Sequence, residues 1–187
     1  MDAAVDTQSA ILVSAAALLR ERTFEDISYL DLAEAAAVSE RTIYRRFPTR
    51  SHLLEALGRW IEAEHFPMGE FGTAAEFRAA ARDRFRAFEA AAAFAFVAAR
   101  GASLSPTADA GGAPVSAAIS DMIAAAAPGL NRRDALRIAA TARYYASPLF
   151  WARMRAGFDM SAEEISDAFD LAMRSVLPAA SKAKSAA

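Results

Sequence analysis

Apolar residues recur at helical spacing along most of this chain, and no other feature restricts its fold as strongly. In the first such segment, Ile11, Leu12, Ala15, Leu18 and Leu19 fall on one face of a helix. The sequence shows neither the strict alternation of apolar and polar residues that marks a half-buried strand nor an internal repeat. We therefore expect an all-α fold.

Capping residues and prolines set the expected helix ends. Ser28, Ser39 and Thr49 are good N-caps, because a short side-chain oxygen can accept a hydrogen bond from the first turn of a helix. Pro48 must end the helix before it, and Pro148 must kink or split a long one. The helices expected from these signals cover residues 7–22, 29–36, 40–47, 50–66, 73–100, 115–127, 132–156 and 162–177.

Composition excludes several classes of protein. With 187 residues and a formal net charge of -2, the chain cannot coat nucleic acid or membrane with its whole surface. It contains no cysteine, which removes disulfides, thiolate metal sites and cysteine nucleophiles. The acidic, polar N-terminus is unlike a secretory signal, and no uncharged apolar run approaches the roughly 20 residues of a spanning helix. We therefore expect a cytoplasmic protein without a membrane partner.

The motifs of common enzyme classes are also missing. The sequence has no Glu-x-x-His pair on a helix, no nucleophile elbow and no phosphate-binding loop. Of the two histidines, His52 falls in a cap region and His65 near a helix end, where a cation suits the helix dipole. We expect no enzyme, and therefore no catalytic residue, no metal site and no cofactor.

Positive charge is concentrated in one short segment. Residues 41–50 hold four arginines and no acid, whereas residues 21–40 hold six acids and Arg22 as their single base. The expected helix at 40–47 places Ile43 and Phe47 toward the core and leaves its arginines exposed. Two short helices joined by a tight turn, the second exposing basic side chains, form the geometry that places a recognition helix in the major groove of DNA.

Residues 11–57 resemble the tetracycline-repressor (TetR) family of bacterial transcription regulators. The family pattern has an aromatic residue after the first helix, a Ser or Thr cap, a "D-I-A-x-A-A-G-V-S" segment and a "T-L-Y-x-x-F-x-x-K-x-x-L-L" segment. The matching residues here are Phe24, Ser28, Asp31, Leu32, Ala33, Ala35, Ala36, Val38, Ser39, Thr42, Ile43, Tyr44, Phe47, Leu53 and Leu54.

Three residues depart from this pattern. Ala37 replaces the glycine of the turn, so it must adopt a left-handed or otherwise strained conformation at a cost of about 1 kcal/mol if the turn is unchanged. Thr23 replaces a second glycine. Arg50 replaces the lysine that begins the fourth helix, which keeps the charge and permits bidentate binding of phosphate.

The resemblance implies contacts of Thr42 and Tyr44 with phosphates and base edges, and of Arg50 with a phosphate. By their chemistry, Arg41 and Arg45 are the better candidates for guanine, because a guanidinium matches O6 and N7 together. The remaining candidates have two readings each: Arg46 can grip DNA or flank it, and the serines can donate to phosphate or only cap helices. The full set of expected DNA-binding residues is Ser28, Ser39, Arg41, Thr42, Tyr44, Arg45, Arg46 and Arg50.

A composition break at "PMGEFG" suggests a domain boundary near Pro67. We expect a helix-turn-helix DNA-binding domain at 1–48, a connecting helix at 49–66 and a larger helical domain at 67–187, for which the resemblance implies effector binding and dimerisation. Aromatic and thioether side chains that can line an apolar effector pocket, or simply form core, are Trp60, Phe85, Phe88, Met122, Tyr144 and Tyr145. Candidate dimer-interface residues, which a single-chain core can equally absorb, are Phe150, Met154, Ile165, Phe169, Leu171, Met173 and Val176.

The sequence therefore predicts a sequence-specific DNA-binding transcriptional regulator. The resemblance favours a repressor that binds a palindromic operator in double-stranded DNA as a homodimer and responds to a small apolar or aromatic effector. The alternative is a helical small-molecule-binding or interaction module without DNA binding, against which the intact arginine face argues.

Overall fold

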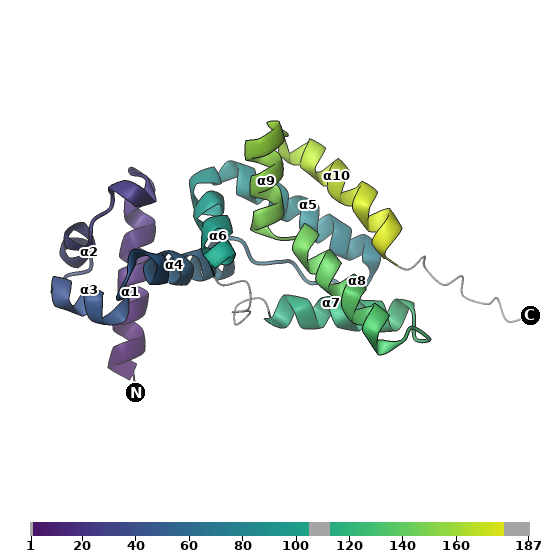
Figure 1. Ribbon diagram of the computed structural model, residues 1–187, viewed down its shortest axis with the longest axis horizontal. Coiled ribbons are helices and arrows are strands. Elements are labelled where there is room, and N and C mark those ends of the chain that lie inside the picture. The colour runs from purple at the N-terminus through teal and green to yellow at the C-terminus, as the bar shows by residue number, and fades with distance from the viewer. Residues whose placement is uncertain (1, 105–112, 178–187) are drawn as a thin grey trace, which may run out of the picture. The chain divides into compact units, whose positions relative to one another are not determined.

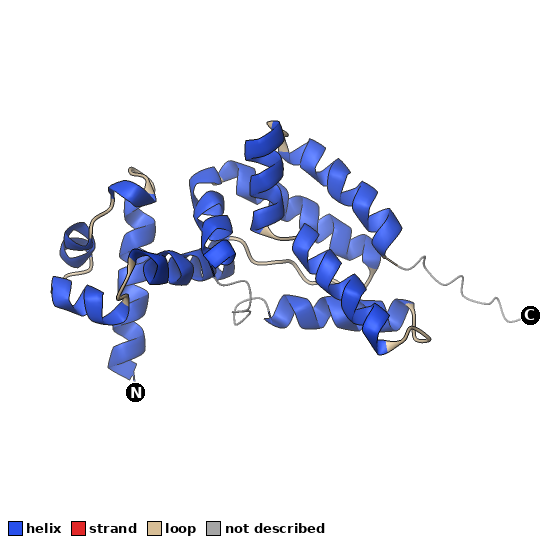
Figure 2. Cartoon of the chain, in the orientation of Figure 1, coloured by secondary structure: helices blue, strands red, loops and turns tan. Residues whose placement is uncertain are grey.

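The computed structural model describes residues 2–104 and 113–177, and regular structure in these ranges is entirely helical (Figure 2). The expected all-α fold is therefore confirmed. Contacts divide the chain into two units, which are described separately. Among the described residues, the first unit contains 2–66 and 91–104, and the second contains 67–90 and 113–177.

The first unit contains the helix-turn-helix. Its core has fully buried apolar residues from several helices, among them Ile11, Leu32, Ile43, Leu53 and Leu57. These positions follow the helical spacing of the sequence, and the expected helices at 29–36, 40–47 and 50–66 agree with the observed ones to within one residue. In chain order the elements of this unit are α1 (Asp2–Leu18), the 3₁₀ turn η1 (Phe24–Asp26), α2 (Tyr29–Ala35), α3 (Glu40–Arg46), α4 (Arg50–His65) and α6 (Ala92–Leu104) (Figure 1).

Aromatic side chains from three helices form the core of the second unit. Phe85 packs edge-to-face on Phe169 with ring centroids 5.5 Å apart, and Phe88 lies 5.6 Å from Trp151. All four are fully buried. The elements of this unit are α5 (Ala74–Ala90), α7 (Ala113–Ala126), α8 (Arg132–Tyr145), α9 (Pro148–Phe158) and α10 (Ala162–Val176) (Figure 1).

Two of the expected helices end elsewhere. The first ends at Leu18, because the backbone then tightens into a 3₁₀ turn in which the amides of Arg20 and Glu21 donate to residues three positions earlier. The helix expected at 73–100 is broken at Ala91 into α5 and α6. Pro148 splits the long helix, as one of the two expected outcomes, and stands at the first turn of α9, where its missing N–H costs nothing.

Close packing of α6 on α4 explains why residues 91–104 belong with the N-terminal part of the chain and not with the expected domain at 67–187. The two helices cross at Gly58 and Gly101. A Cβ atom added at Gly101 would lie 2.8 Å from the carbonyl oxygen of Leu54 and 3.0 Å from the Cα of Gly58. Only glycine permits this approach, and neither glycine is conspicuous in the sequence.

Within the described residues, no single helix is long and apolar enough to cross a membrane. The separate helices α5 and α6 reach the required length and composition only when they are counted together across the break at Ala91.

Candidate nucleic-acid interface

The turn between α2 and α3 contains the strained residue that the sequence predicted. Ala37 has a φ of 52°, in the left-handed region. The amide of Val38 donates to the carbonyl of Ala33 at 3.0 Å, and the amide of Ala37 donates to that of Glu34 at 3.2 Å. These two bonds are the Schellman pattern, which normally places glycine at the left-handed position. The turn keeps this geometry at alanine.

Serine side chains begin both helices of the motif. The Oγ of Ser39 accepts a hydrogen bond from the amide of Thr42 at 3.2 Å and lies 2.9 Å from the Thr42 hydroxyl. Ser28 and Asp31 form a capping box, in which each side chain satisfies the backbone N–H of the other residue. Both serines therefore cap helices, and their contacts with phosphate stay a prediction.

Asp31 of this capping box is also the partner of an arginine. The side-chain and backbone hydrogen bonds from Ser28, followed by that from Arg22, lower the pKa of Asp31 to about 2. The Arg22 guanidinium is 2.9 Å from the carboxylate. Asp31 therefore stays ionised at neutral pH, and its charge is paired with that of Arg22 within the protein.

The exposed face of α3 is basic. Ile43 is fully buried and anchors the helix, whereas Arg41, Tyr44 and Arg45 are exposed and Arg46 is half-buried. Neither Arg41 nor Arg45 has an ion-pair partner among the described residues. Their guanidinium groups are therefore available for the guanine contacts predicted from the sequence.

Tyr44 is held in place by a tyrosine that the sequence analysis did not single out. Its ring packs edge-to-face on that of Tyr29, with centroids 4.7 Å apart, yet Tyr44 is 52% exposed. The buried Tyr29 hydroxyl donates to the carbonyl of Phe47 at 2.7 Å. Burial raises the pKa of Tyr29, so its hydroxyl keeps the donated proton. Tyr29 therefore fixes the position of the Tyr44 ring, which presents its hydroxyl for binding.

Arg50 lies differently from the expected phosphate ligand. Its two terminal nitrogens donate to the carbonyl oxygens of Phe24 and Ile27, and its guanidinium carbon is 4.2 Å from the centroid of the Phe24 ring. The positive charge expected at the start of α4 is present. However, both of its terminal nitrogens already donate to carbonyls inside the first unit.

The six expected effector residues are divided between the two units. Trp60 belongs to the first unit and the other five to the second. Phe85, Phe88 and Met122 are buried, the two phenylalanines in the close-packed aromatic core. Tyr144 is 50% exposed, and its ring contacts Tyr145 at 5.8 Å. Phe85, Phe88 and Met122 therefore fit the alternative that the sequence left open, namely that they form core.

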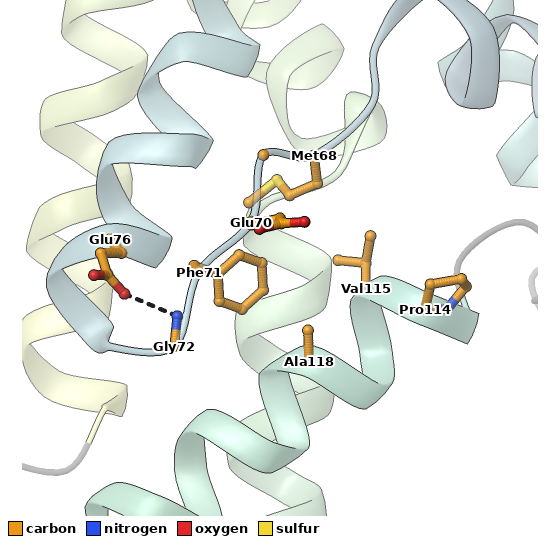
Figure 3. A pocket seen from close by; sticks show the side chains of 9 residues that line it. Met68, Glu70, Phe71, Gly72, Glu76, Pro114, Val115 and Ala118 are labelled. Carbon is orange, nitrogen blue, oxygen red and sulfur yellow. Dashed lines mark hydrogen bonds between the residues drawn. The ribbon is translucent and has the colours of Figure 1, made fainter.

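A hollow with a volume of about 650 Å³ lies elsewhere in the second unit, between the segment before α5 and the start of α7 (Figure 3). Apolar groups from Met68, Phe71 and Val115 face it, together with the carboxylate of Glu70. A second lining acid, Glu76, caps α5 through the amides of Gly72 and Thr73. None of the six expected residues lines this hollow. The composition of the connecting segment gave no signal for it.

Most of the expected interface side chains are buried within their own unit. Phe150, Ile165, Phe169 and Met173 are at most 6% exposed. Such side chains have almost no surface left to bury against a partner. They therefore fit the alternative that the sequence left open, namely the core of a single chain. Of the seven candidates, Leu171 is 65% exposed, and Met154 and Val176 are half-buried.

Comparison with known proteins agrees with the geometry of the N-terminal motif. The family of bacterial regulatory proteins described as the tetR family matches residues 11–57. A search of curated proteins found no match. The matched segment includes α2, the turn at Ala37, α3 and the first half of α4. Proteins of this family are regulators and not enzymes. Through this N-terminal segment, the chain belongs to the tetR family of bacterial regulatory proteins and is a DNA-binding transcription regulator.

Proposed function

We propose that the protein is a ligand-responsive repressor that binds a palindromic operator as a homodimer. The observation that carries this proposal is the exposed basic face of α3, where Arg41 and Arg45 form no ion pair with any described residue and Tyr44 is supported by Tyr29. Each subunit would place α3 in the major groove of one half-site. Arg41 and Arg45 would contact guanines, whereas Thr42, Arg46 and the two capping serines would contact phosphates.

The second unit offers apolar surface for a partner subunit. Leu171 of α10 is 65% exposed, and Leu136 and Tyr144 of α8 are 58% and 50% exposed. The two helices pack against each other, so these side chains belong to neighbouring elements. We expect two copies of this helix pair to meet around a two-fold axis. Leu171, the most exposed of these side chains, is the first candidate for the proposed interface.

An effector would bind in the second unit, and the hollow beside Phe71 and Val115 is our candidate for its site. Its volume falls within the range of about 300–1,000 Å³ that is usual for small-molecule sites. Met68, Phe71 and Val115 offer apolar groups to the small apolar or aromatic effector inferred from the sequence, and the carboxylate of Glu70 adds a polar group to the lining. Val115→Trp fills the hollow, and Ala124→Trp on an exposed part of α7 is its matched control.

Selection of bound duplexes from a random-sequence library of double-stranded DNA tests the proposal most directly. We expect an enriched palindrome, and a complex that contains two copies of the chain. An enriched single half-site bound by one copy would contradict the dimer. The absence of any enrichment at low salt would favour the alternative of a helical binding module without DNA binding.

The effector response is tested with a small-molecule library and the selected duplex. We expect a compound that releases the DNA from the wild-type protein and from Ala124→Trp, but not from Val115→Trp. Release from all three proteins would place the effector outside the hollow.

A further inference from the structure

Two arginines from distant parts of the chain meet at the turn that precedes α2. The guanidinium carbon of Arg50, at the start of α4, lies 4.2 Å from the centroid of the buried Phe24 ring. That of Arg100, in α6, lies 5.9 Å from the same centroid. Glu25, the next residue of the turn, pairs with Arg100 at 2.5 Å. We call Phe24, Glu25, Arg50 and Arg100 the arginine clamp.

Arg50 fixes the backbone of the turn. Its terminal nitrogens donate to the carbonyls of Phe24 and Ile27, which have no helical partner because they lie in and just after η1. Only a guanidinium can reach two carbonyls and stack on a ring at once, since its donors lie in one plane. A lysine at this position has its three N–H donors on a single nitrogen, so it could not place a separate nitrogen at each carbonyl and stack a planar group on the ring.

Arg100 contacts the same turn through the side chain of Glu25. Its hydrogen bond is the main cause that holds the pKa of Glu25 below the usual value for a glutamate. The Arg100 side chain is 49% exposed and that of Glu25 57%, so the pair adds little to overall stability. Any effect of this pair must therefore appear in the placement of the turn, and not in the free energy of unfolding.

Tyr29 connects the arginine clamp to the recognition helix, α3. Tyr29 lies 5.9 Å from the Arg50 guanidinium carbon, measured to its ring centroid. The same ring supports Tyr44 of α3, and its hydroxyl holds the carbonyl of Phe47 at the end of α3. A shift of the turn thus moves the support of α3.

We propose that Arg50 and Arg100 are positioning residues for DNA binding, which hold α3 in its binding orientation through the η1 turn, and that Arg50 does not bind a phosphate. The proposal rests on the DNA-binding function of the first unit. It gives α6 a direct connection to the helix-turn-helix through Glu25, in addition to its packing on α4.

The salt dependence of DNA binding separates positioning from a phosphate contact. Each neutralised phosphate adds about 0.9 to the slope of log K against log salt, so a lost phosphate ligand lowers that slope. We expect Arg50→Lys and Arg50→Ala to weaken binding to the selected duplex by a similar factor, about tenfold, without changing the slope. Arg86→Ala removes an exposed arginine of α5 that pairs with Asp83, and it should leave both quantities unchanged.

Binding can be measured by fluorescence polarisation of the labelled duplex between 50 and 300 mM salt. Near-normal affinity of Arg50→Lys, together with a slope reduced by about 0.9 per subunit in Arg50→Ala, would establish a phosphate contact and overturn the proposal. Normal affinity of both variants would overturn it too. A wild-type protein that selects no duplex would refute the proposed function itself, and the clamp with it.

A double-mutant cycle tests the Arg100 side of the clamp without touching buried atoms. Glu25→Gln and Arg100→Gln should each weaken DNA binding about two- to fivefold, and the double variant should bind no worse than either single one. The thermal midpoint of Glu25→Gln should equal that of the wild type, which a merely structural role would not predict for a variant with reduced affinity. Additive effects, or no effect of either substitution, would show that Arg100 does not act through Glu25.

Discussion

The two units of the chain cap their helices alike but fill their cores with different side chains. Ser28 and Asp31 close a capping box in the first unit, as Ser161 and Glu164 do in the second, and the largest fully buried side chains of the first unit are aliphatic. In the second, the largest buried groups are aromatic rings such as Phe85 and Trp151, which pack on residues far away in the sequence. Directional contacts set the orientation of an exposed helix, whereas aromatic packing mainly supplies stability.

Each unit contains one of the two tryptophans, which allows the comparison to be tested by fluorescence. In a Trp60→Phe background, the emission of Trp151 reports on the second unit. The binding of DNA reports on the first.

Removal of an aromatic ring should affect the second unit most strongly. Phe85→Ala takes away a fully buried ring that contacts Phe88, Phe150 and Phe169, so we expect a loss of about 3–5 kcal/mol in the free energy of unfolding. Urea unfolding followed by Trp151 emission measures this loss. A loss below about 1 kcal/mol would mean that these rings do not form a close-packed core.

The crossing of α4 and α6 should be the most sensitive backbone contact of the first unit. Gly101→Ala places a methyl group 2.8 Å from the Leu54 carbonyl, and we expect a cost of about 1–3 kcal/mol. Gly157→Ala in α9 is the control, because an added Cβ meets nothing within 4 Å there. Thermal unfolding followed by circular dichroism should show a lower midpoint for the first variant only. Equal midpoints would show that α6 can move away from α4 freely.

The turn before α3 should become more stable when its strain is relieved. Ala37→Gly suits the left-handed φ of 52°, and we expect a gain of about 0.5–1 kcal/mol, reduced by the greater freedom of glycine in the unfolded chain. Chemical unfolding of the variant measures this gain. The equivalent change Ala79→Gly, at an exposed interior position of α5, should destabilise instead.

The Ser28–Asp31 capping box should make a small, pH-dependent contribution to the free energy of unfolding of the first unit. Because the pKa of Asp31 falls from 3.8 to about 2 on folding, its contribution is complete above the unfolded value and is lost as the pH falls from about 4 toward 2. Asp31→Asn should lose this part of the pH dependence. A control, Asp83→Asn, changes an acid outside any capping box and should retain it. Identical pH profiles for both variants would rule out Asp31 as the source.

Local signals were enough to predict the motif, and they were insufficient for the rest. The left-handed Ala37, the serine caps and the exposed arginines of α3 depend on residues within a few positions of one another, and the first two are confirmed. The Glu25–Arg100 pair joins residues far apart in the sequence, so no local pattern predicts it. The crossing of α4 and α6 at Gly58 and Gly101 is not predicted by any local pattern either.

Periodicity also failed to tell core from function. Phe85, Phe88, Ile165 and Phe169 stand at the same helical spacing whether they face a pocket, a partner or their own core, because spacing defines a face and not what covers it. The structure places all four in the core of the second unit. A charge pattern likewise does not reveal that the Arg50 guanidinium meets the carbonyls of Phe24 and Ile27.

The first unit is discontinuous along the chain, and this affects its synthesis. Its last helix, α6, follows α5, which belongs to the other unit. A ribosome adds about 5–20 residues per second, so for a few seconds the emerging chain holds α1 to α4 while the Gly58 side of α4 still lacks α6. During this interval the nascent helix-turn-helix exposes an apolar helix face on which chaperones can act. A regulator of this design cannot complete its DNA-binding unit until more than half of the chain has been translated.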